Sequence, residues 1–341
     1  MRLNLEEPCV GTLGSCALRA TEPPLWLTPT VGSSKVGFVA LVAAIAIWGA
    51  NWPVMKIGLD HVSPLWFSSL RFASGSLCLF VWQAIRGEIR LPRRGDAPFI
   101  ASVGLLQMLA FTALGAAAMT HLPAGRSAML SYVTPLWVVP ASMLIFGERA
   151  SIRVVAGVAI CAAGIVVLMN PATIDWSNGS IAGANAMLLA ASLCWALCIL
   201  HLRYFRSPSS AFELAPWQML LAAGLLAIGA NYVEGPFTGD GSMSFWAILL
   251  FVGPLATAFC FCVVNAASTW LPAGTMSTAM LGVPVTGVAL SVALFGEPLT
   301  LGLAAGSLAI LAGIAVTALA GSSRPISKKA QQPSPLPVTR G

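Results

Sequence analysis

The amino-acid sequence predicts an all-α membrane protein in which ten transmembrane helices form two inverted five-helix repeats. Three observations lead to this prediction: the apolar composition, a succession of ten long apolar segments, and a block of sequence that occurs twice. Of the 341 residues, 57% are hydrophobic and 9% are charged, and the mean hydropathy is +0.83. A soluble domain carries about a quarter charged residues. The composition therefore excludes a water-soluble globular protein and a disordered chain.

The net charge of +6 does not indicate a nucleic-acid partner, because the basic residues are scattered over short hydrophilic segments between apolar ones. Six of the eight cysteines lie inside apolar segments, at spacings that differ from metal-binding and redox motifs. We interpret them as packing residues, and we expect no metal site, no cofactor and no catalytic residue.

Each predicted span has about the 20 apolar residues that a helix needs to cross a bilayer. The first span, near 36–57, follows residues 1–35, which lack the basic start and single apolar core of a cleaved signal peptide. We expect residues 1–35 to be a cytoplasmic tail, or the product of an over-long start assignment. The other nine spans are predicted at 65–85, 97–118, 123–146, 152–170, 181–202, 212–232, 244–268, 273–296 and 299–320. Residues 322–341 are polar and proline-rich and are expected to form a basic disordered tail.

The distribution of basic residues predicts that both termini are cytoplasmic. With this orientation, most of the 18 Lys and Arg residues fall in the inside segments. The outside loops hold acidic residues, with Lys56 at a helix end. This asymmetry is typical of short loops in membrane proteins.

An internal repeat has an offset of 149 residues, because residues 122–148 align without a gap with residues 271–297. Both copies begin Leu-Pro-Ala-Gly and end Phe-Gly-Glu, and a fainter match pairs Trp48 with Trp195. Five spans per copy is an odd number, so the second copy must cross the membrane in the opposite direction. Inverted repeats are typical of carriers that work by alternating access around a central site. We therefore predict one repeat at 36–171 and the other at 180–321.

Several motifs carry a family resemblance over residues 36–320: Trp48-Gly49-Ala50-Asn51, Ser63-Pro64 followed by Leu70-Arg71-Phe72, and the two copies of the repeated block. In these motifs the chain resembles the EamA-like branch of the drug/metabolite transporter superfamily. The resemblance implies ten helices, a cavity lined by helices 1, 3, 4, 6, 8 and 9, and export of amino acids or other metabolites from the bacterial cytoplasm. The two repeats differ in their charges. The second lacks a counterpart of Arg71 and has Thr275 where the first has Arg126, so any site is expected to be asymmetric.

Arg71 and Arg126 are the two basic residues well within predicted spans, where a charge is costly and commonly functional. A guanidinium can form two parallel hydrogen bonds with a carboxylate. We predict that Arg126 binds substrate and treat Arg71 as a secondary charge. The alternative is that both side chains extend to lipid headgroups or bind helix carbonyls.

The remaining candidate substrate-binding residues are aromatic or polar and lie on helices that the resemblance assigns to the cavity. They are Trp48, Asn51, Trp52, Gln107, Tyr132, Trp137, Trp195 and Asn265. The alternative for each is a role in packing between helices.

The acidic residues are interpreted as structural, because Glu148 and Glu297 fall at helix ends, where a carboxylate favours the N-terminus of the next helix. With no Asp or Glu in the middle of a span, we expect uncoupled transport or coupling through the charge of the substrate. Small residues along single helix faces, including Gly157, Gly164 and Gly313, predict close packing of the fifth and tenth helices or a homodimer contact.

Together these observations predict a secondary transporter in the bacterial inner membrane that exports amino acids or related compounds. Its expected partners are a small-molecule substrate and the lipid bilayer. One alternative is import or exchange of sugar- or nucleotide-linked metabolites, which the few intramembrane basic residues disfavour. Another is a non-enzymatic receptor or scaffold, which the repeat disfavours. An enzyme is not predicted, because the spans contain no GxSxG, no HExxH and no paired carboxylates.

Overall fold

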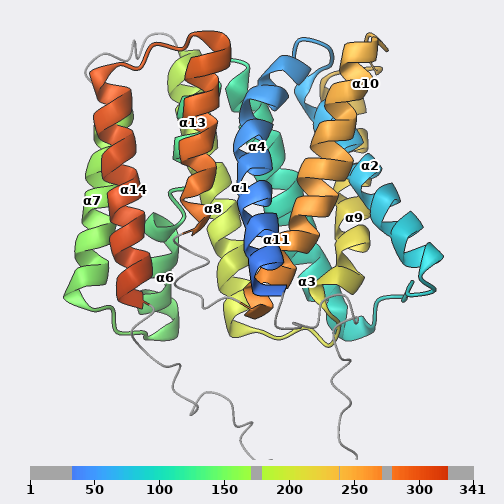
Figure 1. Cartoon of the computed structure of the whole chain (residues 1–341), viewed down its shortest axis with the longest axis horizontal. Coiled ribbons are helices and arrows are strands. Elements are labelled where there is room, and N and C mark those ends of the chain that lie inside the picture. Colours follow the sequence, from blue (N-terminus) through green and yellow to red (C-terminus); the bar gives the residue numbers. More distant parts are fainter. Residues whose placement is uncertain (1–32, 170–178, 238, 271–278, 322–341) are drawn as a thin grey trace, which may run out of the picture.

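A computed structural model describes residues 33–169, 179–237, 239–270 and 279–321. All regular elements in these ranges are helices, as predicted. The expected tails at 1–32 and 322–341 lie outside the described residues. Figure 1 shows the helices as one bundle, with α7 and α14 at one edge and α2 and α9 at the other.

The first half of the chain supplies five spans. They are α1 (Ser33–Gly58), α2 (Pro64–Ile85), a third span built from η1 (Arg94–Asp96), α3 (Ala97–Ala101), η2 (Ser102–Ala110) and α4 (Phe111–Met119), a fourth built from α5 (Ala124–Ser131) and α6 (Pro135–Phe146), and α7 (Ile152–Met169). The fourth span is divided between α5 and α6, where Pro135 lacks the backbone N–H that would continue the ladder of hydrogen bonds.

The second half follows the same order. Its elements are α8 (Gly179–Tyr204), α9 (Ala211–Val233), a third span built from α10 (Met243–Leu250), η3 (Phe251–Phe259) and α11 (Cys260–Trp270), then α13 (Gly282–Phe295) and α14 (Leu301–Gly321). Nine helical segments in the described ranges are long and apolar enough to cross a membrane. The tenth expected span, 273–296, is described from residue 279 onward, and its helix α13 is shorter than the other nine.

The two copies match in backbone detail. Gly147 ends α6 and Gly296 ends α13, and both adopt the left-handed conformation, with φ of 66° and 61°. A Cβ atom is strained in that conformation, which explains a glycine at both helix ends. η2 and η3 are both π-helices, and each lies inside the third span of its repeat at the same 149-residue offset.

The repeats are interleaved, because the most extensive helix contacts join one repeat to the other: α7 with α14, α2 with α9, α1 with α13 and α4 with α8. The pair α7 and α14 uses the predicted glycine faces. A Cβ atom on Gly157 would lie 2.8 Å from the carbonyl oxygen of Gly313, and one on Gly164 would lie 2.9 Å from that of Gly306. These glycines therefore permit a close contact within one chain.

Polar contacts between the repeats join helices at one end of the bundle, called here the Glu297 end and drawn uppermost in Figure 1. The carboxylate of Glu297 accepts hydrogen bonds from the backbone N–H groups of Ala124 (2.9 Å) and Gly125 (3.3 Å) at the start of α5. Glu234 does the same at the start of α2, where it accepts from the Leu65 N–H at 2.8 Å. Each carboxylate lies at the positive end of a helix from the other repeat. For Glu297 that helix is α5, and not the next helix of the chain, α14, which the sequence predicted as its partner.

Another pair at the Glu297 end joins the α1–α2 turn to the segment before α10. His61 Nδ1 lies 2.6 Å from Asp240 Oδ2. The hydrogen bond from His61 lowers the pKa of Asp240. Nearby, the ammonium of Lys56 donates to the carbonyl oxygens of Met119 and Leu122 and so links the end of α1 to the α4–α5 turn.

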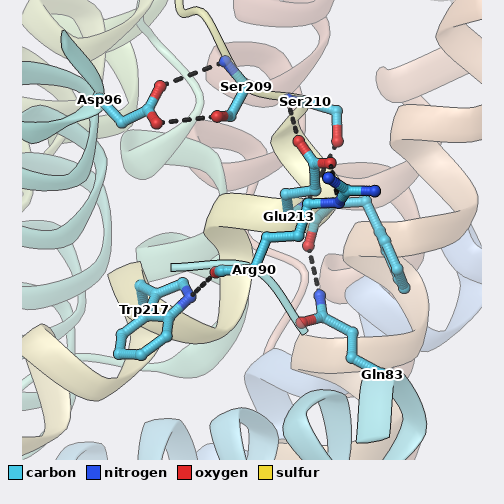
Figure 2. A network of polar contacts seen from close by, with 8 residues as sticks. Gln83, Arg90, Asp96, Ser209, Ser210, Glu213 and Trp217 are labelled. Atoms are coloured by element: carbon cyan, nitrogen blue, oxygen red, sulfur yellow. Dashed lines mark hydrogen bonds and ion pairs between the residues drawn. The ribbon is translucent and has the colours of Figure 1, made fainter. Parts of the chain in front are cut away.

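The opposite end is called the Glu148 end and is expected to be cytoplasmic. The network of polar contacts in Figure 2 joins helices of the two repeats at this end. Asp96 accepts hydrogen bonds from the backbone N–H (3.2 Å) and the hydroxyl (2.8 Å) of Ser209. Arg90 lies 3.6 Å from Glu213, and its carbonyl oxygen accepts from the Trp217 indole. The network links the α2–α3 connection to the start of α9.

Candidate functional site

A cavity of about 120 Å³ lies between the repeats, between the Glu297 end and the Glu148 end. A cavity needs roughly 10–15 Å³ to hold one water molecule, so this one has room for a solute of roughly ten non-hydrogen atoms. It is lined by Trp48, Asn51, Trp52, Met55, Arg71, Phe72, Gln107, Met108, Phe111, Thr112, Gly115, Tyr132, Trp195, Met219, Ala256, Thr257 and Phe261. The first four spans of one repeat and the first three of the other contribute.

The two π-helices bring matching positions to the cavity. Gln107 and Met108 lie in η2, and Ala256 and Thr257 lie at the equivalent positions of η3. A π-helix bonds each residue to the fifth one along, which changes the face that later residues present and is often found at functional sites. The repeated backbone therefore places chemically different side chains at matching positions of the cavity lining.

Arg71 is the only Lys or Arg residue among the described residues that line the cavity. It is the eighth residue of α2, roughly 10 Å from the Glu297 end at 1.5 Å per helical residue. Its Nε donates to the Thr257 hydroxyl at 2.7 Å, and its Nη1 lies 3.0 Å from the sulfur of Met55. Both partners are neutral, and the ion pairs among the described residues all lie at the two ends of the bundle.

Asn51 is a second polar group in the wall and is 6% exposed. Its Nδ2 donates to the Met55 sulfur at 3.1 Å. Its Oδ1 is buried and has no hydrogen-bond donor among the described residues. An unpaired buried acceptor is costly.

Aromatic rings form the apolar part of the cavity. Trp195 lies edge-on to Phe111 and to Tyr132, with ring centroids 5.2 and 5.1 Å apart. The Trp48 indole donates to the Ala256 carbonyl oxygen at 2.6 Å, which fixes its ring across the repeat boundary. A few placed polar groups among many apolar ones are typical of small-molecule sites.

The structure brings together seven of the ten residues named from the sequence. Trp48, Asn51, Trp52, Gln107, Arg71, Tyr132 and Trp195 all line the cavity. The cavity also extends to α2 and α9, which the family resemblance did not include, and no described residue of α13 lines it.

The other three predicted residues lie outside the cavity lining. Arg126 donates through Nη2 to the carbonyl oxygen of Met169 at 3.1 Å. The Trp137 indole donates to the Ser192 hydroxyl at 2.7 Å. Asn265 donates to the carbonyl oxygen of Phe261 at 2.8 Å.

The sequence interpretation did not identify Thr257 and Met55, which hold Arg71 in place. A signal for Thr257 existed, because the repeat offset pairs it with Met108, one position after Gln107. Within the described ranges, no three His, Cys, Asp or Glu side chains are grouped as a metal site would require.

Comparison with known proteins gives a family match in both halves of the chain. Residues 35–170 and 183–319 match the model of the EamA-like transporter family. The uncharacterized transporter YoaV of Bacillus subtilis is 23% identical over 289 residues, which cover 84% of this chain and 98% of the relative. A probable amino-acid metabolite efflux pump of Salmonella typhimurium is 29% identical over 294 residues, which cover 83% of this chain and 94% of the relative.

A solved crystal structure has the same fold. It superposes with a TM-score of 0.57 at 21% identity and covers 83% of this chain and 98% of its own. At this identity the likeness concerns the fold alone.

Proposed function

The chain belongs to the EamA-like transporter family, and on that premise we propose that it exports amino acids or related small metabolites by alternating access. It is a multi-pass membrane transporter, and its family is one of transporters rather than enzymes. The observation that carries the proposal is the cavity, which both inverted repeats line and which holds one guanidinium among aromatic rings. The proposed site of action is the bacterial inner membrane.

The contacts at the Glu297 end support the alternating-access part of the proposal. Glu297 and Glu234 each bind the start of a helix from the other repeat. We expect these contacts to break when the cavity opens toward this end. In inverted-repeat carriers, one repeat rocks against the other around a fixed site, and the carboxylates lie where such movement would separate them from their partners.

Amino acids are the favoured substrates for two reasons. The Salmonella relative is named as a probable amino-acid metabolite efflux pump, and the cavity offers one cation to one carboxylate. A phosphorylated or nucleotide-linked metabolite carries about two negative charges near neutral pH, and the described lining offers Arg71 alone to meet them.

Flux from proteoliposomes tests this function. Vesicles containing the purified protein are loaded with an equal mixture of amino acids, organic acids and sugar phosphates, and solute loss is measured by mass spectrometry. We expect loss of amino acids with apolar side chains to exceed that from protein-free vesicles. Exclusive loss of sugar phosphates would favour the exchange alternative, and equal loss with and without protein would contradict a transport function.

We propose that transport does not require a proton carried by a cavity carboxylate. The described acidic residues lie at the ends of the helices or in turns, and none lines the cavity. Amino-acid efflux should therefore change little when a pH gradient is imposed across the vesicle membrane. A strong stimulation by external acidification would show that a proton is coupled to the substrate.

A further inference from the structure

We propose that Arg71 and Asn51 form a head-group site that binds the carboxylate and the amino group of an α-amino acid, while its apolar side chain lies against the aromatic rings of the cavity. This inference rests on the proposed function and assigns substrate recognition to particular residues.

The argument for the carboxylate starts from the neutral surroundings of Arg71. A buried cation is expensive unless an anion compensates for it. Here the described partners of the guanidinium are the hydroxyl of Thr257, the sulfur of Met55 and the Phe72 ring, whose centroid lies 5.6 Å from Cζ. Each is a weaker partner than a carboxylate. A substrate carboxylate in the cavity would supply the missing countercharge.

Thr257 fixes the orientation of the guanidinium. Its hydroxyl donates to the carbonyl oxygen of Val252 at 2.7 Å and accepts from Arg71 Nε at 2.7 Å. These contacts leave Arg71 Nη2 without an acceptor among the described residues. The site is therefore preorganised, and binding a carboxylate does not require the long side chain to be ordered first.

The argument for the amino group starts from Asn51. Its Oδ1 has no donor in the described part of the chain. Asn51 and Arg71 also lie next to each other, because their side-chain nitrogens both contact the same sulfur atom of Met55. An α-amino acid carries its amino group and its carboxylate on one carbon, so neighbouring acceptor and donor groups suit it.

The rest of the cavity selects the side chain. Trp195, Phe111 and Tyr132 line the same cavity as Arg71, and the Trp195 ring lies edge-on to the other two rings. A second carboxylate on the ligand would find no second cation in the described lining, and a second ammonium would find no carboxylate. We therefore infer a preference for neutral amino acids with aliphatic or aromatic side chains.

Three ligands that share a phenyl group test each half of the site. Phenylalanine carries both head groups, 3-phenylpropionate lacks the amino group, and 2-phenylethylamine lacks the carboxylate. Their affinities for the full-length protein in detergent are measured by calorimetry with the wild type, Arg71→Gln, Asn51→Leu and the matched control Arg153→Gln. Arg153 is exposed at the start of α7, a helix that contributes no residue to the described cavity lining.

The wild type and Arg153→Gln should bind phenylalanine more tightly than either analogue. Arg71→Gln should weaken phenylalanine binding about tenfold or more, the size expected for hydrogen bonds to a charged group. It should also bind phenylalanine and 2-phenylethylamine within about twofold of each other, because the carboxylate has lost its partner. Asn51→Leu should bind phenylalanine and 3-phenylpropionate with affinities within about twofold of each other, because the amino group has lost its partner. A merely structural role of either residue would weaken all three ligands equally.

The head-group proposal is overturned if Arg71→Gln keeps the wild-type preference for ligands with a carboxylate, or if Arg126→Gln removes that preference instead. If Arg71→Gln fails to fold, the affinities of the wild type still test the proposal. Equal affinity of the wild type for phenylalanine and 2-phenylethylamine overturns it. Measurements of amino-acid efflux distinguish a failure of the head-group site from a failure of the proposed function. Amino-acid efflux with an unchanged ligand preference in Arg71→Gln contradicts only the head-group site, whereas no amino-acid efflux by the wild type contradicts the proposed function as well.

Discussion

Two contacts between the repeats are equivalent by the internal symmetry. One joins α2 to η3, and the other joins α9 to η2. In the first, Arg71 of α2 donates to Thr257 of η3 at 2.7 Å. In the second, the position that matches Arg71, at the offset that pairs Trp48 with Trp195, is Gln218. Its amide donates to the Phe99 carbonyl oxygen at 3.5 Å, and Met108 replaces Thr257.

The difference shows how a symmetric scaffold can hold an asymmetric site. Backbone features recur in both contacts, since each π-helix contributes to the cavity wall. The charge and the hydroxyl that orients it occur in only one of them. Symmetry of the scaffold is thus compatible with a binding site on one side of the pseudo-twofold axis.

Gly253 and Gly104 offer the largest test of this comparison, because they hold the same position in η3 and η2. A Cβ atom on Gly253 would collide with the Ser74 hydroxyl and lie 2.9 Å from the Arg71 carbonyl oxygen. On Gly104 the nearest atoms would be 3.1 Å away, and one of them belongs to the flexible Leu221 side chain. Gly253→Ala should lower the free energy of unfolding by about 1–3 kcal/mol, and Gly104→Ala by less than about 1 kcal/mol. Denaturant titration in detergent measures both, and an equal or larger loss for Gly104→Ala would contradict the asymmetry.

Thr257 should produce the next largest effect. Thr257→Val keeps the shape of the side chain but removes the oxygen that accepts from Arg71 Nε. We expect amino-acid binding to weaken about tenfold, or about 1.4 kcal/mol. Thr257→Ser retains the hydroxyl and should bind within about twofold of the wild type. Calorimetric titration distinguishes the two, and the absence of rescue by serine would assign the residue to packing.

Glu297 and Glu148 test the comparison at the ends of the bundle. Glu297 binds the start of α5, whereas Glu148 lies 3.0 Å from Arg203 in a pair whose side chains are 38% and 50% exposed. Glu297→Gln should cost about 0.5–1 kcal/mol of stability through the lost charge–dipole interaction. Glu148→Gln should cost less than about 0.5 kcal/mol, because exposed ion pairs contribute little. Thermal unfolding in detergent checks the order, and a larger loss for Glu148→Gln would reverse it.

Gln218 should give the smallest effect. Its hydrogen bond to Phe99 is long, at 3.5 Å, and its Oε1 is buried without a donor among the described residues. Gln218→Leu should therefore change stability by no more than about 0.5 kcal/mol and leave amino-acid binding intact. A loss of binding comparable to that of Arg71→Gln would mean that both sides of the pseudo-twofold axis contact the substrate.

The sequence predicted the fold well because the relevant signals are sums over many residues. Hydropathy over about 20 positions indicated each span, and a gapless match between 122–148 and 271–297 indicated the repeats. The family model confirms this architecture in both halves. A misleading residue changes a sum over 20 positions only slightly. A prediction about one side chain has no such average to rely on.

The site was harder to predict because a helix in lipid can be apolar on every face, so that hydrophobic periodicity does not mark the side that lines a cavity. The family assignment of its helix favours Arg126 over Arg71, yet Arg126 donates a hydrogen bond to Met169 and Arg71 lines the cavity. The π-helices add a second obstacle. A stretch of i→i+5 bonding displaces the residues that follow it from the 3.6-residue pattern, and neither η2 nor η3 was expected from the sequence.

The matching positions of the two π-helices also bear on the history of the gene. Long π-helices are rare. The described part of this chain has two, each nine residues long and separated by the repeat offset, and inheritance from a single five-helix ancestor that already contained a π-helix explains both. Gene duplication and fusion then produced the present chain. Once the gene was duplicated the two copies could evolve separately, and the arginine that distinguishes α2 from α9 was gained or lost by one copy after that duplication.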